Sequence, residues 1–272
     1  MSRDLPSVDL VVATVGRTDE LGRFLDSIEA QGYGPLRVIV VDQNGDERVA
    51  EIAHGRGFEL VHERAERGLS RARNAGLGQI ESDLVAFPDD DCVYPPGLLE
   101  RVAERFGDSG LDGLTGRAVD SEGRSSASWK SDPALLTDDN LWNRAISFTI
   151  FLRAGIVRRY GMFDEQLGLG SGTAWSSGEE TEYLVRAVAG GARIDYDPAL
   201  TVTHDEKPGG DGAKEGASLG YILRKHDYPA RAVTRMLIRP AGGALVALAR
   251  RDLAQARFQL DTLRGRLRGY RS

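Results

Sequence analysis

The sequence predicts an α/β protein built around a mostly parallel, doubly wound central sheet. Short runs of strand-forming residues alternate with amphipathic helical segments along the first third of the chain. One apolar run, residues 84–87, leads directly into the carboxylates Asp89, Asp90 and Asp91, at the kind of sheet edge where such folds bind ligands. The chain has 272 residues, 41% hydrophobic and 28% charged, which suits one large globular domain or a domain with an appendage.

The first half of the chain alternates between the two element types. Runs rich in Val, Ile and Leu predict strands at residues 8–15, 36–41, 58–61 and 84–87. Apolar residues at helical spacing, such as Leu21, Phe24, Leu25 and Ile28, predict a first helix at residues 21–28. Similar patterns predict further helices at residues 49–54, 69–79 and 98–106.

The second half is less regular. Strands are expected at residues 111–119, 146–152 and 193–204, the last with a break at Pro198, and a helix is expected at residues 179–189. Polar and small residues predict a surface loop at 121–139, a Gly/Ser-rich loop at 168–178 and a flexible Gly-rich turn at 207–216.

Composition excludes several classes of protein. The single cysteine, Cys92, excludes an internal disulfide framework and a thiolate metal cage. The apolar run at 10–13 is too short for the core of a signal peptide. No stretch approaches the ~20 apolar residues that a membrane span needs, since the longest, 241–249, is short and contains two glycines. We therefore expect a cytoplasmic protein.

Charge is unevenly distributed along the chain. From Arg224 to the end, twelve basic residues stand against three Asp, so this segment carries +9 and the rest carries −15. Leucines at near-helical spacing lie between the arginines, from Leu245 to Leu267. Two interpretations stay open: a packing or dimerising helix with a solvated face, or weak peripheral contact with an anionic membrane surface.

The acidic triplet, Asp89–Asp91, predicts a metal site. Three carboxylates at one strand end repel one another, so a site that keeps them needs a compensating cation. Oxygen ligands combined with a diphosphate suit Mg²⁺ or Mn²⁺. The alternative is a solvated acidic loop. Asp42 ends a neighbouring strand at the same sheet edge, where it serves either as a ligand contact or as a turn cap.

The helix expected at 179–189 opens with acids, which suit the positive end of its dipole. Glu180 shares a face with Leu184 and Ala187, so its side chain is expected to point inward, and Glu179 is expected on the outer face. No second inward-facing acid is expected between residues 168 and 182. An inward carboxylate beside a Gly-rich loop is suited to abstracting a proton.

Five segments in this order resemble the large inverting glycosyltransferase family 2. They are Val40-Val41-Asp42, Ser70-Arg71-Ala72-Arg73-Asn74-Ala75-Gly76, Phe87-Pro88-Asp89-Asp90-Asp91, Gly178-Glu179-Glu180-Thr181-Glu182 and Val202-Thr203-His204. The resemblance runs from about Val8 to His204. It implies the GT-A fold, with a Rossmann-like sheet, and the basic segment is then a C-terminal helical extension.

The resemblance also implies roles for individual residues. Thr14 and Asp42 match positions that contact the nucleobase and ribose, and Arg73 matches an arginine that meets the nucleotide. Asp89, Asp90 and Asp91 match the DXD-type segment, in which the last acid holds Mn²⁺ or Mg²⁺ and the first two contact ribose and sugar. His204 matches a strand-end histidine that adds a metal or diphosphate contact. Glu180 matches the catalytic base.

Two departures from the family pattern leave choices open. The usual Pro-Thr-Tyr-Asn-Arg entry is Ala13-Thr14-Val15-Gly16-Arg17 here, without the aromatic residue, so the base of the nucleotide is not fixed. The base position is commonly Asp and is Glu180 in this chain, which leaves Glu179 as a rival.

The expected activity is metal-dependent transfer of a hexosyl-type sugar from a nucleotide diphosphate donor to an acceptor hydroxyl, with inversion. The donor is expected to be a UDP-sugar and the acceptor a saccharide or lipid-linked saccharide, in polysaccharide or glycolipid assembly. Alternatives are a haloacid-dehalogenase-like phosphatase, for which Asp89-x-Asp91 fits the signature, a sugar-phosphate nucleotidyltransferase, and a non-catalytic sugar-nucleotide-binding protein.

The expected organisation has three parts. Residues 1–120 form the nucleotide-sugar-binding half of one domain, residues 121–223 its acceptor-binding and catalytic half, and residues 224–272 the basic helical extension. No nucleic-acid partner is expected. Membrane contact, if the extension makes it, is expected on the inner face of the membrane.

Overall fold

The computed structural model describes residues 5–107, 110–125, 129–204 and 211–272. The chain forms two compact units. The sheet unit comprises Met1–Arg67, Arg71–Phe163 and Tyr183–Glu206, and the helical unit comprises Gly68–Ser70, Asp164–Glu182 and Lys207–Ser272. The functional division at residues 120 and 223 stays a prediction, because compactness does not test it.

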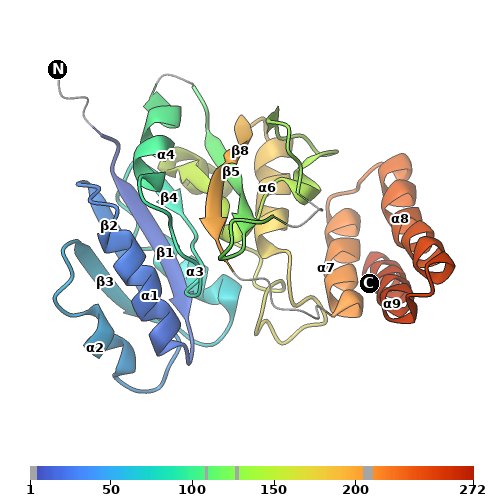
Figure 1. Ribbon diagram of the computed structural model, residues 1–272, viewed down its shortest axis with the longest axis horizontal. Coiled ribbons are helices and arrows are strands. Elements are labelled where there is room, and N and C mark those ends of the chain that lie inside the picture. The colour runs from blue at the N-terminus through green and yellow to red at the C-terminus, as the bar shows by residue number, and fades with distance from the viewer. Residues whose placement is uncertain (1–4, 108–109, 126–128, 205–210) are drawn as a thin grey trace. The chain divides into compact units, whose positions relative to one another are not determined.

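The sheet unit confirms the predicted fold class. Its eight strands lie in the order β3-β2-β1-β4-β7-β5-β8-β6, and β1 to β4 are mutually parallel (Figure 1). Only β7 and β6 run antiparallel to their neighbours. The strands are β1 (Val8–Thr14), β2 (Leu36–Asp42), β3 (Glu59–Arg64), β4 (Leu84–Ala86), β5 (Gly113–Val119), β6 (Ala134–Leu135), β7 (Phe151–Arg153) and β8 (Ile194–Thr203).

Helices cover both faces of this sheet. Alternate residues of β1, such as Val8, Leu10 and Val12, join a buried core with α1 (Thr18–Glu29), α2 (Arg48–Ala53) and α4 (Leu98–Gly107). The intervening residues of β1, such as Val11, face α3 (Leu69–Leu77) on the other side of the sheet. This helix approaches so closely that a Cβ added at Gly76 would overlap Val11. The sheet unit also contains α5 (Ala154–Tyr160) and the part of α6 (Glu179–Ala189) from Tyr183 onward, while the first four residues of α6 belong to the helical unit.

Two expectations for the sheet unit are wrong in part. Residues 146–152 were expected to form one strand, yet Ser147–Thr149 form a 3₁₀ turn and the strand begins only at Phe151. Thr149 N donates to Ile146 O at 2.9 Å and Ile150 N donates to Ser147 O at 3.1 Å, so these backbone groups are satisfied within the turn and not by a neighbouring strand. The polar segment 121–139 contains β6, which pairs with β8.

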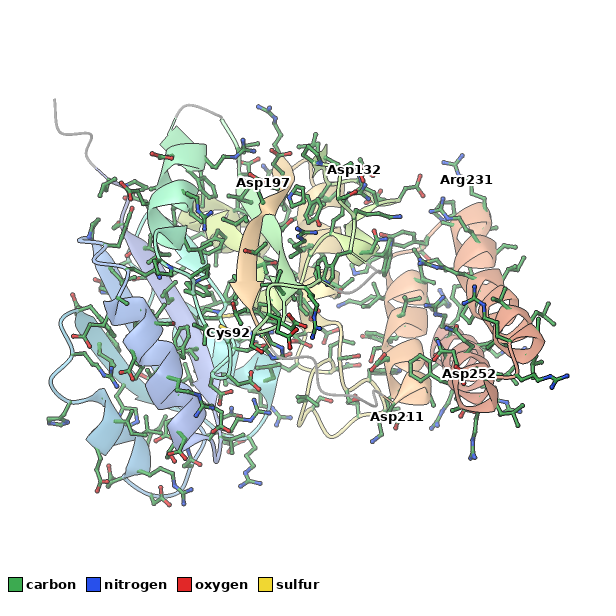
Figure 2. All side chains as sticks on the ribbon, viewed as in Figure 1. Cys92, Asp132, Asp197, Asp211, Arg231 and Asp252 are labelled. Carbon is green, nitrogen blue, oxygen red and sulfur yellow. The ribbon has the colours of Figure 1, made fainter. Side chains whose placement is uncertain are left out.

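The helical unit contains three long helices, α7 (Gly212–Lys225), α8 (Ala230–Ala249) and α9 (Leu253–Arg271). Asp211 caps α7 by accepting from Ala213 N and Lys214 N, and Asp252 caps α9 by accepting from Gln255 N (Figure 2). The flexible turn expected at 207–216 is therefore wrong for residues 212–216, which begin α7, while residues 207–210 lie outside the described part.

Glycines explain this error, because they serve helix packing and not a turn. Gly212, Gly216 and Gly220 lie four residues apart on α7 and face α9, and Gly265 and Gly269 of α9 face α7. A Cβ at any of the last four would overlap backbone atoms of the facing helix. The two backbones are therefore in direct contact along this seam.

A single added methyl group tests this seam. Gly265→Ala should lower the melting temperature, because its Cβ would overlap Ala213 O and overpacking costs about 1–3 kcal/mol. Gly242→Ala in α8 is the matched control: nothing lies within 4 Å of its added Cβ, and helix propensity alone should raise stability by ~1 kcal/mol. If circular dichroism gave Gly265→Ala the same melting temperature as the wild type, close packing of α7 on α9 would be contradicted.

Among the described residues, one helix is long and apolar enough to cross a membrane. Within the 20-residue helix α8, a window of 18 residues has a mean hydropathy of 1.3, and 33% of that window is buried. The expectation that no segment approaches this length is thus wrong by length and composition. Buried helices of globular proteins meet the same criteria, and α8 packs its buried residues on α9.

Candidate functional site

Distant segments meet at the C-terminal ends of β1, β4 and β8. Asp89 forms a parallel bridge with Ala13, at the end of β1. Four residues later, Val93 and Thr203 exchange two backbone hydrogen bonds of 2.8 and 3.0 Å, which ties the triplet's exit to the end of β8. These two bridges bring the acidic triplet beside Thr14 and His204, at the edge of the sheet where the triplet was expected.

Asp90 is the most enclosed member of the triplet, with a side chain only 6% exposed. Thr14 Oγ1 donates to its Oδ2 at 2.8 Å, and Arg17 Nη1 donates to its Oδ1 at 2.9 Å. Burial raises the pKa of Asp90, and the bonds from Thr14 and Arg17 oppose that rise. Burial lowers the pKa of Arg17, but the attraction of Asp90 and Asp91 outweighs it and leaves the pKa raised.

Asp89 lies against an almost fully buried arginine. Arg73 is 1% exposed, and its Nη2 approaches Asp89 Oδ1 to 3.1 Å. Ser147 Oγ donates to the same oxygen at 3.2 Å, and the Arg73 guanidinium lies over the Phe163 ring at 5.6 Å. The structure thus places Arg73, predicted to meet the nucleotide, directly behind the acidic triplet.

Asp91 and His204 are neighbours although 113 residues separate them, with 3.1 Å between Asp91 Oδ1 and His204 Nε2. The His204 ring stacks on Phe148 at 4.8 Å between centroids. One ligand atom each from Asp89, Asp91 and His204 lie within 4.8 Å of one another. Two carboxylates and an imidazole fit a divalent ion such as Mn²⁺. The structure thereby adds Asp89 to the predicted metal pair.

Asp42 lies at the same edge, at the end of β2, with a fully buried side chain. Its Oδ1 accepts from the backbone and side-chain nitrogens of Asn44, both at 2.8 Å. Its Oδ2 lies 3.0 Å from His62 Nε2. The turn interpretation of Asp42 is therefore realised in the structure, and its contact with a nucleotide stays a prediction.

The acids of α6 in the helical unit differ from the expected arrangement. Glu179, expected on the outer face, is 4% exposed, and Glu180 is only partly buried. The carboxylate of Glu179 packs against Gly168, where an added Cβ would lie 3.1 Å from both Glu179 Oε2 and Ser70 Oγ. The face assignment was wrong because the loop before α6 folds back over its first turn.

Glu182 is a second buried acid in this segment, contrary to expectation. Its side chain is fully buried, with Lys225 Nζ at 2.7 Å and His226 Nε2 at 3.0 Å from its Oε1. Lys225 Nζ also lies 2.8 Å from Asp164, and the two partners raise the pKa of Lys225 although burial lowers it. These ion pairs give Glu182 a structural role that the sequence pattern did not show.

Sequence reasoning missed Arg17 and Ser147, whose side chains contact the triplet. The sequence did contain a sign of the role of Arg17, since it follows Thr14 by three residues in the loop after β1.

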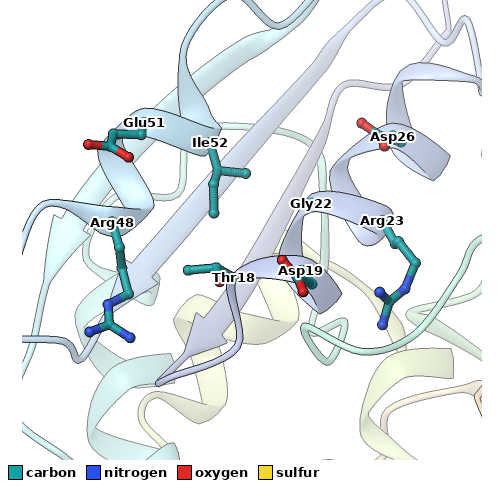
Figure 3. A pocket seen from close by; sticks show the side chains of 8 residues that line it. All are labelled: Thr18, Asp19, Gly22, Arg23, Asp26, Arg48, Glu51 and Ile52. Atoms are coloured by element: carbon teal, nitrogen blue, oxygen red, sulfur yellow. The ribbon is translucent and has the colours of Figure 1, made fainter.

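A separate pocket lies between α1 and α2 and is lined by charged residues that include Asp19, Arg23 and Arg48 (Figure 3). It contains none of the predicted site residues. Cys92, labelled in Figure 2, lies in the sheet unit. Its side chain is fully buried, and burial raises the pKa of its thiol well above the usual value, as expected of an unreactive cysteine.

Comparison with known proteins points to one family. The model of Glycosyl transferase family 2 matches residues 9–163. The chain is 24% identical over 233 residues to glycosyltransferase AglE of Haloferax volcanii, covering 81% of this chain and 74% of that protein. It is 29% identical over 217 residues to the pre-mycofactocin glycosyltransferase of Mycobacterium tuberculosis, covering 74% of this chain but only 43% of that protein. Succinoglycan biosynthesis protein ExoM of Rhizobium meliloti is 23% identical, covering 89% of this chain and 79% of that protein.

Solved structures show the same fold. The mannosyltransferase PcManGT from Pyrobaculum calidifontis, in complex with GDP-Man and Mn²⁺, superposes with a TM-score of 0.67 at 16% identity, covering 98% of this chain and 88% of that one. TarS 1–349 from S. aureus, in complex with UDP-GlcNAc, gives a TM-score of 0.64 at 16% identity, covering 94% and 90%.

Proposed function

The chain belongs to glycosyltransferase family 2 and has the GT-A fold. From this premise we propose that it is a metal-dependent enzyme that transfers a hexosyl group from a nucleoside-diphosphate sugar to an acceptor hydroxyl, with inversion. The observation that carries the proposal is the group formed by Asp89, Asp91 and His204 at the sheet edge. These three residues would hold a divalent ion, whose positive charge would offset the charge building on the leaving diphosphate.

The residues of the sheet unit then have distinct roles toward the donor. Thr14 and Asp42 are proposed to contact the ribose and base, and Asp90 the ribose and sugar. The buried Arg73, paired with Asp89, is proposed to orient that carboxylate and to meet the nucleotide. In the helical unit, Glu180 is proposed to take the proton from the acceptor hydroxyl as the anomeric carbon is attacked.

One assay separates this proposal from its alternatives. Release of nucleoside diphosphate should be measured from a panel of UDP- and GDP-sugars with a mixture of saccharide acceptors, with and without Mn²⁺. Release that requires both metal and acceptor supports the proposal. Phosphate release from sugar phosphates would indicate a phosphatase, pyrophosphate release a nucleotidyltransferase, and binding without release a non-catalytic protein. UDP is our first choice of nucleotide.

The setting is proposed to be polysaccharide or glycolipid assembly, with a saccharide or lipid-linked saccharide as acceptor. The similarity to a protein named for succinoglycan biosynthesis supports this proposal. We also propose a cytoplasmic location with weak contact to the inner face of the membrane. The exposed face of α8 supports that contact, since it combines Leu245, 69% exposed, and Ile238, 61% exposed, with arginines and no acid.

Liposome flotation tests the membrane contact. Leu245→Glu should reduce flotation with anionic liposomes at low salt several-fold, because it removes apolar contact and adds a repelled charge. Leu135→Glu is the control, since Leu135 is 47% exposed on β6, outside the helical unit. If Leu245→Glu floats like the control but dissociates a dimer in light scattering, α8 is a subunit interface and the membrane proposal fails.

A further inference from the structure

Arg17 forms ion pairs with two members of the acidic triplet at once. Its Nη1 lies 2.9 Å from Asp90 Oδ1 and 2.8 Å from Asp91 Oδ2. The other oxygen of Asp91, Oδ1, already faces His204 Nε2 at 3.1 Å. Both carboxylate oxygens of Asp91 are therefore engaged, so an incoming metal ion has to compete with Arg17, with His204 or with both for this residue.

Arg17 and Arg73 both pair with the triplet but differ in how firmly they are held. Arg73 is 1% exposed and lies over Phe163, so its guanidinium is fixed by packing. The side chain of Arg17 is 40% exposed and extends from the loop between β1 and α1, just after Gly16. Leaving the triplet therefore costs Arg17 no packing, but its carboxylate partners are enclosed, with side chains only 6% and 13% exposed. A new positive charge therefore has to compensate them when Arg17 leaves.

We propose that Arg17 is an exchangeable counter-ion: it holds Asp90 and Asp91 while the donor is absent and moves to the donor's diphosphate when a metal–nucleotide complex enters. The inference rests on the proposed function and adds a residue that orders the binding of its ligands. A divalent ion at Asp91 repels the guanidinium 2.8 Å away from that carboxylate. A diphosphate provides the new partner, since the planar guanidinium matches phosphate oxygens with two parallel hydrogen bonds.

The exchange has a consequence for affinity. Metal alone has to displace Arg17 without offering it a new partner, so it binds weakly. Metal together with a nucleoside diphosphate moves Arg17 from one anion to another, so the two ligands favour each other's binding. Arg17 is thus a positioning residue whose removal changes the two affinities in opposite directions.

The test is a pair of calorimetric titrations on the full chain, Mn²⁺ alone and then UDP or GDP in saturating Mn²⁺. Arg17→Gln should bind Mn²⁺ alone about tenfold more tightly and the better nucleotide about tenfold more weakly than the wild type, the scale of one unit charge at a partly exposed site. Arg17→Lys keeps the charge and loses the planar fork, so it should leave Mn²⁺ affinity near the wild-type value and still weaken nucleotide binding.

Arg23→Gln is the matched control. It removes the same charge from α1, where Arg23 is 64% exposed and its nearest acid, Glu20, lies 3.9 Å away. Both affinities should stay within about twofold of the wild type, because surface charges at a distance are screened by salt. This control separates the local effect of Arg17 from a change in net charge.

Each remaining outcome overturns the exchange. If Arg17→Gln weakens both ligands, Arg17 only holds the triplet in shape, and if neither affinity changes, it does not compete with the metal. A wild type that binds neither nucleotide in the presence of Mn²⁺ overturns the proposed function as well. Normal nucleotide binding by the wild type without the opposite shifts in Arg17→Gln overturns the role of Arg17 alone.

Discussion

Replacing Asp91 by asparagine should abolish the response of donor binding to Mn²⁺ and lower turnover by at least about 10²–10³-fold, the scale on which lost electrostatic stabilisation acts. Asparagine keeps the size of the side chain but removes the charge that a divalent ion needs. Asp91 is 13% exposed and faces both His204 and Arg17, so no other described acid has the same set of neighbours. Calorimetry with UDP and GDP, each with and without Mn²⁺, measures the effect.

Neighbouring substitutions sharpen that result. Asp90→Asn should be milder, because Asp90 is enclosed by Thr14 and Arg17 and is not among the three grouped metal ligands. Asp89→Asn should weaken the Mn²⁺ response without abolishing it. Asp26→Asn, at a 70% exposed acid on α1, is the control and should change nothing. Tight UDP or GDP binding by the wild type that ignores Mn²⁺ would remove the metal from the mechanism.

The sheet was predictable because its signals are local. The run Val8–Thr14 is almost entirely buried, and its mostly apolar residues, interrupted by Asp9, are typical of a strand covered on both faces. Helix α4 occupies Leu98–Gly107, close to the predicted 98–106, since five apolar residues define its buried stripe. The alternation of such segments along the chain sufficed to predict a parallel sheet and the edge that carries the triplet.

The rest depended on contacts between distant residues. The approach of His204 to Asp91 follows from the pairing of Val93 with Thr203, which no local pattern shows. Glycines were read as turn formers at 212 and 216, although their four-residue spacing was a signal for close helix packing. The burial of Glu179 was missed for a similar reason. Helical periodicity predicts only which face of α6 packs on the core, whereas Glu179 is covered by the loop at Gly168, which lies elsewhere in the sequence.

The exposure of the α6 acids still favours Glu180 over Glu179 as the catalytic base, for a different reason from the one the sequence suggested. A base has to reach the acceptor hydroxyl, and the partly exposed Glu180 is accessible, whereas Glu179 is 4% exposed and packed against Gly168. Glu182 is fully buried and engaged by Lys225 and His226. Among these three acids, Glu180 is the one with a side chain that a substrate can approach.

Glu180→Gln should therefore lower kcat by about 10²–10⁴-fold, the usual contribution of a general base, and leave donor affinity nearly unchanged. Glu180→Asp, which introduces the residue common at this position in the family, should retain more activity than the amide. Glu179→Gln should mainly lower the melting temperature, because it alters a packed carboxylate. If Glu179→Gln reduces kcat more than Glu180→Gln at an unchanged melting temperature, the base is Glu179.

The stereochemistry of the product completes this prediction. With a single base and no covalent intermediate, the acceptor oxygen attacks the face opposite the departing diphosphate, so the anomeric configuration inverts. The buried Glu179 and Glu182 do not change this expectation, because neither is accessible enough to attack a sugar as a nucleophile. Proton NMR of the product formed in the first turnovers reports the anomeric coupling constant. Retention of the donor's configuration would rule out the single displacement and, with it, the role of Glu180 as its base.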